Sequence, residues 1–157
     1  MRTTSAEETR EFAAALAVIA QAGDRIALIG PLGAGKTQFA KGFARGLGVT
    51  EVVNSPSFTL MAEYAGRLPM FHQDLYRLTG AEEAMAGGMV DERQLDGVTL
   101  SEWAERLPAE IDPERVTVAI EVLGDDERQI TVTPIRETQR RYVDAARAWV
   151  PGSPVAQ

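Results

Sequence analysis

The chain has 157 residues, of which 45% are hydrophobic and 25% are charged. This is the size and composition of one globular domain with a real core, which we place at residues 1–150 with a flexible tail at 151–157. A net charge of -7 argues against a protein that grips nucleic acid by itself, because such proteins neutralise phosphates with Lys and Arg. The lack of cysteine excludes disulfides and thiolate metal sites, and no apolar run suits a membrane span or a signal segment.

The first predicted helix begins at Ser5. Ser5 and Glu8 have the spacing of a capping box, in which each residue satisfies a backbone N–H of the first turn. Phe12, Leu16 and Ile19 follow at helical spacing and form one apolar face. We expect this helix to cover a sheet.

Residues 30–37 read Gly-Pro-Leu-Gly-Ala-Gly-Lys-Thr and fit G-x-x-x-x-G-K-[ST], the phosphate-binding P-loop. A β-branched run at 25–29 precedes the motif and a helical pattern at 39–47 follows it, which is the context that the motif requires. Glycines let the loop turn successive N–H groups inward, and the helix N-terminus adds positive potential. Lys36 can reach the β- and γ-phosphates, and Thr37 offers a hydroxyl to Mg²⁺. The predicted nucleotide-binding residues are Gly30, Pro31, Leu32, Gly33, Ala34, Gly35, Lys36, Thr37 and Gln38.

A turn at Ser55-Pro56-Ser57 precedes a predicted strand at 58–64. Two interpretations stay open for it. It is either a plain connecting turn or a mobile loop whose Ser55 and Ser57 hydroxyls sense the γ-phosphate.

Another strand begins at Met70 and Phe71, and Asp74 lies at its end. In an open α/β sheet the ligand crevice lies outside the carboxyl ends of the strands, which is where Asp74 would fall. It can order a magnesium-bound water or accept a proton. His72 is the chain's single histidine, and we expect a structural role for it because its partners cannot be identified from sequence.

The stretch 97–103 reads as a short strand that ends in Glu102 and Trp103. A Walker B element delivers an acid to Mg²⁺ from such a strand, opposite the P-loop hydroxyl. Glu102 is therefore the predicted metal ligand beside Thr37. The alternative is a surface glutamate before a half-buried tryptophan.

Two strands at 116–122 and 129–135 flank a hairpin loop at 124–127, and a helix is expected at 137–149. Four arginines near the end (136, 140, 141 and 147) form either a local basic patch or a solvated helix face, and we favour the solvated face. The pattern predicts an α/β fold with an antiparallel C-terminal hairpin.

Five stretches together resemble one bacterial family, and they are Gly30-Pro-Leu-Gly-Ala-Gly-Lys-Thr37, Ser55-Pro-Ser-Phe58, Glu63-Tyr64, His72-Gln-Asp-Leu-Tyr-Arg77 and Glu102-Trp103. Their order and spacing are similar to those of TsaE, the tRNA threonylcarbamoyladenosine (t6A) biosynthesis ATPase, over about residues 5–135. The chain departs from the family where Pro31 replaces a common Asp and Ser57 replaces a common Thr. Pro31 removes one amide donor from the loop, whereas Ser57 keeps a hydroxyl.

The resemblance implies a P-loop NTPase-like three-layer sandwich with a mainly parallel central sheet, and a Mg²⁺-dependent ATPase activity. The missing signal segment and the predicted nucleotide indicate the cytoplasm. No arginine finger is evident in the sequence, so we expect slow turnover by the chain alone and faster turnover with partners. Those partners are TsaD and TsaB homologues, which ATP hydrolysis would reset between turnovers; tRNA would be met only through that complex, and no membrane is involved. By position, residues 33–37 hold the phosphates of ATP, and Thr37 and Glu102 bind Mg²⁺. Trp103, beside the metal ligand, is a further expected ATP-binding residue. The catalytic residues expected are Lys36, Ser55, Ser57, Asp74 and Glu102.

Two other functions stay open. A small-molecule kinase would use Asp74 as base for an acceptor hydroxyl and Arg77 as a charge clamp. A non-enzymatic switch would bind nucleotide and recruit a partner without turnover. A GTPase is disfavoured, because the sequence has neither Asn-Lys-x-Asp nor Asp-x-x-Gly.

Overall fold

The computed structural model describes residues 1–56, 60–77, 90–106 and 113–153. Within these ranges one sheet has the strand order β1-β7-β6-β2-β5-β4-β3. The strands are β1 (Arg2–Thr3), β2 (Arg25–Ile29), β3 (Met61–Tyr64), β4 (Met70–Asp74), β5 (Val98–Glu102), β6 (Val116–Val122) and β7 (Arg128–Thr133). The helices are α1 (Ala6–Val18), α2 (Lys36–Gly46) and α4 (Arg140–Ala148), with short 3₁₀ turns η1 (Glu92–Asp96), η2 (Ala104–Arg106) and η3 (Glu137–Gln139).

The centre of the sheet is parallel. Strands β6, β2, β5 and β4 run in one direction, whereas β3 and the β7–β1 pair at the two edges are antiparallel. The α/β class, the mainly parallel sheet and the antiparallel C-terminal hairpin are confirmed. The division into residues 1–150 and a tail at 151–157 stays a prediction, and residues 154–157 lie outside the described part.

Parallel strands place their carboxyl ends at one edge of a sheet, and this positions the polar residues. The P-loop leaves the end of β2, Glu102 ends β5 and Asp74 ends β4. Leu28 of β2 is level with Glu102, and Asp74 is level with Glu102 from the other side. The three segments therefore meet at one place.

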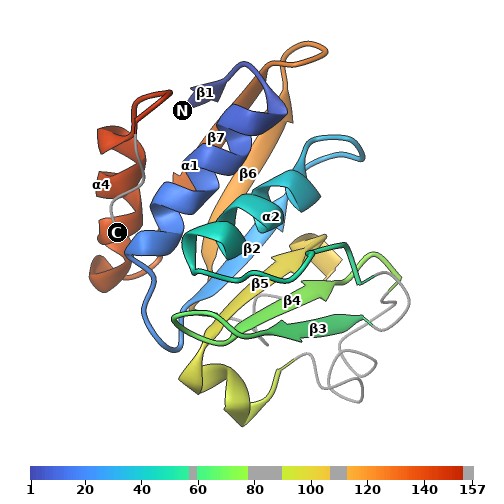
Figure 1. Ribbon diagram of the computed structural model, residues 1–157, viewed down its shortest axis with the longest axis vertical. Helices are drawn as coiled ribbons and strands as arrows, with labels where there is room; N and C mark the ends of the chain where they lie inside the picture. The colour runs from blue at the N-terminus through green and yellow to red at the C-terminus, as the bar shows by residue number, and fades with distance from the viewer. Residues whose placement is uncertain (57–59, 78–89, 107–112, 154–157) are drawn as a thin grey trace.

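Helices α1 and α2 lie side by side over one face of the sheet (Figure 1). Half of the predicted capping box is present: the Ser5 hydroxyl accepts from the Glu8 N–H at 3.0 Å, whereas the Glu8 carboxylate accepts from the Thr4 N–H at 2.6 Å. The rings of Phe12 and Phe39 pack edge to face between the two helices, with centroids 6.4 Å apart. This contact buries the core side of both helices and fixes α2, which carries the P-loop, against the sheet.

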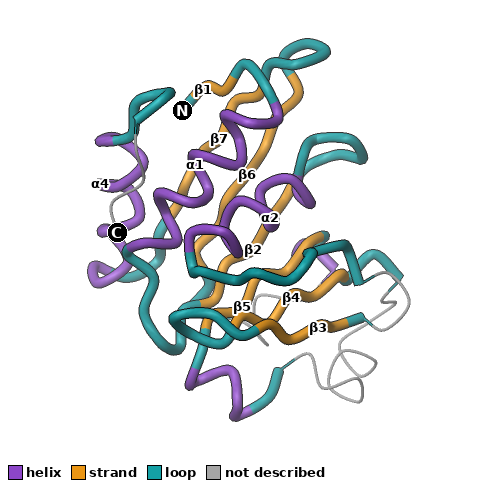
Figure 2. The backbone as a smooth tube through the Cα atoms, in the orientation of Figure 1, coloured by secondary structure: helices purple, strands orange, loops and turns teal. Residues whose placement is uncertain are grey.

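Helix α4 lies beside α1, on the side away from α2 (Figure 2). Trp149, just beyond α4, packs edge to face on Phe12 with centroids 5.4 Å apart. Arg141 and Tyr142 both donate to Asp24 in the turn before β2, and burial with this carboxylate beside it raises the pKa of Tyr142. The interpretation of the C-terminal arginines as solvated is wrong for Arg141, because it ties α4 to the core.

Gly42 of α2 sets how closely the two front helices approach. A Cβ added at Gly42 would lie 2.1 Å from the Arg10 carbonyl oxygen of α1. We expect Gly42→Ala to lower the free energy of unfolding by about 1–3 kcal/mol, because overpacking outweighs the gain in helix propensity. Gly124→Ala is the matched control, since its nearest neighbour would be 4.0 Å away. Urea unfolding of both variants measures the difference, and equal stabilities would contradict this packing.

Candidate functional site

The P-loop uses its glycines in two different ways. Gly33 and Gly35 have φ angles of +80° and +103°, in the left-handed region that other residues avoid. Gly30 instead makes a close approach, because a Cβ there would lie 2.6 Å from the Ile120 carbonyl oxygen of β6. The loop is thus wound tightly against the end of the sheet, and Gly35 forms the N-cap of α2.

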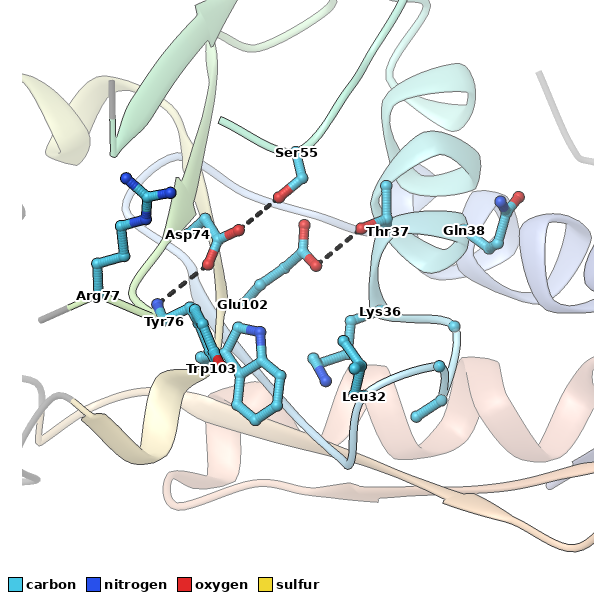
Figure 3. A pocket seen from close by; sticks show the side chains of 13 residues that line it. Leu32, Lys36, Thr37, Gln38, Ser55, Asp74, Tyr76, Arg77, Glu102 and Trp103 are labelled. Carbon is cyan, nitrogen blue, oxygen red and sulfur yellow. Dashed lines mark hydrogen bonds between the residues drawn. The ribbon is translucent and has the colours of Figure 1, made fainter. Parts of the chain in front are cut away.

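Lys36 bends back over its own loop. Its Nζ donates to the Gly30 carbonyl at 2.5 Å and to the Pro31 carbonyl at 3.0 Å. The same Nζ lies 3.9 Å from the centroid of the Trp103 ring, a cation–π contact (Figure 3). Burial lowers the pKa of Lys36, because it disfavours the charged ammonium. Lys36 is therefore a partly desolvated cation beside the P-loop.

Thr37 and Glu102 are 65 residues apart in the sequence and are in contact in the structure. The Thr37 hydroxyl donates to Glu102 Oε1 at 2.9 Å, from the first turn of α2 to the end of β5 (Figure 3). Glu102 is 3% exposed, and its second oxygen lies 2.6 Å from His72 Nε2. The fully buried His72 ring comes from β4 and fixes the direction of the carboxylate. This contact gives His72 the partner that the sequence did not reveal.

These oxygens suit Mg²⁺. A hydroxyl and a carboxylate are the hard oxygen donors that this ion takes, and it keeps several waters besides. In the part of the chain that the structure describes, no group of three or more His, Cys, Asp and Glu residues is placed to hold a metal. A pair of protein ligands completed by water and phosphate oxygens fits Mg²⁺ better than a closed protein cage would.

Asp74 and Ser55 form a second hydrogen-bonded pair. The Ser55 hydroxyl donates to Asp74 Oδ2 at 2.5 Å, and the Tyr76 N–H donates to Asp74 Oδ1 at 3.0 Å. Asp74 is 7% exposed at the end of β4. Ser57, the other predicted hydroxyl of this loop, lies outside the described residues.

Trp103 adopts an unusual backbone conformation. Its φ of +57° is in the left-handed region, which a bulky residue enters only when its surroundings hold it there. Its ring packs on Tyr76 with centroids 5.0 Å apart and presents its other side to Lys36. The backbone conformation after Glu102 thus places the Trp103 ring against Lys36.

One cavity of about 580 Å³ brings most of the predicted residues together. Of the predicted set it is lined by Leu32, Gly33, Ala34, Gly35, Lys36, Thr37, Gln38, Ser55, Asp74, Glu102 and Trp103. Gly30 and Pro31 do not line it and instead accept hydrogen bonds from Lys36. Tyr76 and Arg77 also line the cavity, and Tyr76 was not predicted for the site.

Arg128 supports the P-loop from behind. From the start of β7 its guanidinium donates to the Ala34 carbonyl at 2.9 Å, the Gly33 carbonyl at 3.1 Å and the Gly124 carbonyl at 2.8 Å. These hydrogen bonds hold two consecutive carbonyl groups of the loop against the start of β7. Sequence reasoning missed Arg128, because its partners are main-chain atoms that no motif records.

The sequence is similar to those of one known protein family. The family model "Threonylcarbamoyl adenosine biosynthesis protein TsaE" matches residues 3–130. The chain belongs to the TsaE family. It is 45% identical over 135 residues to a Bacillus subtilis protein named tRNA threonylcarbamoyladenosine biosynthesis protein TsaE, covering 85% of this chain and 84% of that protein. A Treponema pallidum protein of the same name is 41% identical over 128 residues, covering 82% of this chain and 95% of the relative.

A solved structure supports the same assignment. The crystal structure of Bacillus subtilis YdiB superposes on this TsaE family member with a TM-score of 0.74 at 40% sequence identity. The match covers 94% of this chain and 92% of the other. The likeness therefore includes the P-loop, the sheet and the C-terminal hairpin together.

Arg128→Ala should loosen the P-loop of this protein. We expect amide hydrogen exchange within residues 30–38 to speed up by about 10- to 150-fold, since loss of charged hydrogen bonds costs about 1.5–3 kcal/mol in total. Exchange in the core of α1 should stay unchanged. Arg2→Ala is the matched control, because Arg2 forms an exposed ion pair with Glu127 on the same hairpin. Unaltered exchange in the P-loop of the Arg128 variant would show that the guanidinium does not hold it.

Proposed function

We propose that the chain is a Mg²⁺-dependent ATPase that acts in tRNA t6A biosynthesis. The observation that carries the ATPase proposal is the 2.9 Å contact of Thr37 with Glu102 inside the cavity that also holds Lys36. It is the arrangement of a Walker A hydroxyl opposite a strand-borne acid. Membership of the TsaE family supports the pathway.

Each residue of the cavity has its own role in phosphoryl transfer. This reaction needs positioning and charge neutralisation more than covalent chemistry. P-loop N–H groups and Lys36 bind the phosphates, for which the Lys36 ammonium exchanges its two carbonyl partners for phosphate oxygens. Thr37 and Glu102 would hold Mg²⁺, which when bound neutralises charge on the phosphate oxygens.

Asp74 is our candidate for the residue that acts on water. Its hydrogen bonds from Ser55 and from the Tyr76 N–H fix both carboxylate oxygens at the cavity wall. We assign it the orientation of the attacking water, with the Ser55 hydroxyl as the loop's reporter of the γ-phosphate. Trp103 orients the Lys36 ammonium through the cation–π contact. We propose for Ser57 the same γ-phosphate-sensing role as for Ser55.

The proposed reaction resets a complex of TsaD and TsaB homologues, and tRNA is reached only through that complex. Leu32 is 86% exposed and Tyr76 is 53% exposed at the rim of the cavity, apolar surface that a partner would cover. Among the described helices there is none of the length and apolarity that crossing a bilayer demands. We propose a cytoplasmic location with the tRNA-modifying machinery.

A small-molecule kinase is the second candidate, because Arg77 lines the cavity near Asp74 as a charge clamp would. An ATPase releases phosphate to water, whereas a kinase yields a phosphorylated acceptor. Analysis of the product separates the two.

Glu102→Ala should reduce Mg²⁺-dependent ATP turnover by about 100-fold, since it removes a metal ligand at the developing charge. Circular dichroism checks that the variant is folded. Glu92→Ala is the control, because Glu92 is an exposed acid in η1, far along the chain from the P-loop. Full activity in the Glu102 variant would remove this residue as the metal ligand.

Partners should accelerate the reaction. We expect slow phosphate release by the isolated chain and at least about tenfold faster release with a TsaD–TsaB complex, because ordering of the exposed rim completes the site. Steady-state phosphate release with and without the complex measures this. An unchanged rate would contradict the proposed resetting role.

A further inference from the structure

The two carboxylate oxygens of Glu102 have different partners. Oε1 accepts from the Thr37 hydroxyl at 2.9 Å, and Oε2 lies 2.6 Å from Nε2 of His72. A carboxylate that binds a metal is ionised and only accepts hydrogen bonds, so the hydrogen of the second contact is on Nε2. Oε1, beside Thr37, is therefore the oxygen that a metal ion can take without disturbing His72.

His72 cannot give up its contact with Glu102 without a cost. Its ring is fully buried, and Nδ1 has no hydrogen-bond partner among the residues that the structure describes. Nε2 therefore makes the one hydrogen bond that the ring has within this part of the chain. Because solvent does not reach the ring, turning Oε2 away would leave a buried N–H unpaired, with the full cost of its desolvation. His72 thus holds Oε2 in place.

The acids of the cavity are both restrained by their neighbours. His72 and Glu102 belong to the neighbouring parallel strands β4 and β5, and such strands position side chains more precisely than loops do. Asp74, level with Glu102 on β4, accepts from the Ser55 hydroxyl with one oxygen and from the Tyr76 N–H with the other. Neither Glu102 nor Asp74 can therefore turn both of its oxygens to one ion without losing a hydrogen bond.

Divalent cations differ in how many protein oxygens they need. Mg²⁺ is small, demands octahedral geometry and is content with one or two carboxylates besides waters and phosphate oxygens. Ca²⁺ is larger, takes more oxygens at longer distances and often binds both oxygens of one carboxylate. A carboxylate that is restricted to one oxygen therefore suits Mg²⁺ and offers less to Ca²⁺.

We propose that His72 is a specificity-determining positioning residue, which keeps Glu102 to one metal-binding oxygen and so makes the site select Mg²⁺ over the larger Ca²⁺. The inference rests on the proposed Mg²⁺-ATP site and deepens it, since it concerns the choice of ion. His72 acts through Glu102 and binds neither the ion nor the nucleotide. Carboxylates that bind metals depend on such hydrogen-bond partners, whose loss weakens metal binding by about 10- to 100-fold.

The test replaces His72 in two ways. His72→Leu removes the hydrogen-bond donor, whereas His72→Gln keeps a side-chain N–H that can reach Oε2 of Glu102. Isothermal titration measures the affinity of each chain for a non-hydrolysable ATP analogue with Mg²⁺, with Ca²⁺ and with EDTA. We expect His72→Leu to weaken binding with Mg²⁺ by about tenfold or more, and binding with Ca²⁺ or without metal by less than about threefold. His72→Gln should keep the preference of the unmodified chain for Mg²⁺.

Gln73→Leu is the matched control. Gln73 is fully buried on the same strand, points to the other face of the sheet and accepts from the Ser101 hydroxyl at 2.9 Å, so its loss disturbs β4 without removing the partner of Glu102. An unchanged ratio of Mg²⁺ to Ca²⁺ affinities in His72→Leu overturns the inference. An equal loss under all three conditions, or the same change of ratio in Gln73→Leu, also overturns it, because His72 would then act only through the fold. If the unmodified chain binds the analogue no better with Mg²⁺ than with EDTA, the proposed metal site itself fails.

Discussion

The hydrogen bond between Thr37 and Glu102 depends on the register of two parallel strands. Leu28 of β2 is level with Glu102 of β5, so the P-loop leaves the sheet beside the carboxylate that ends the neighbouring strand. The hydroxyl at the start of α2 then lies 2.9 Å from Glu102. A slip of one residue in β5 would turn the carboxylate to the other face of the sheet and separate the pair.

The rest of the site is built outward from this contact. His72 contacts the remaining carboxylate oxygen of Glu102. The left-handed backbone of Trp103 directs its ring to the Lys36 ammonium, with which it forms a cation–π contact. Arg128 holds the P-loop from the far side. The ionisable groups at the centre are thereby oriented before a ligand is bound, which spares the reorganisation that a flexible site would need.

Local signals in the sequence predicted much of this molecule. The P-loop with its flanking strand and helix, the cap at Ser5 and the hairpin strands are encoded in short patterns, and the structure reproduces them. The strand that ends in Glu102 was harder to predict, because Thr99 and Ser101 interrupt its apolar run although both are buried.

What the sequence did not reveal depends on contacts between distant residues. The His72–Glu102 pair joins neighbouring strands 30 residues apart, and Arg128 binds main-chain carbonyls 94 and 95 residues away. Strand β1 is two residues long and owes its conformation to pairing with β7, so no periodicity marks it. The sequence pattern indicated a solvated Arg141, because its partner Asp24 is distant in the chain and only the fold brings the two together.

A crystal structure with Mg²⁺ and a non-hydrolysable ATP analogue would show whether Thr37 and Glu102 share the metal ion. We expect an ion between Thr37 and Glu102, about 2.1 Å from an oxygen of each, with the terminal phosphate against Lys36. An ion bound away from Glu102, with the Thr37–Glu102 hydrogen bond still intact, would contradict it.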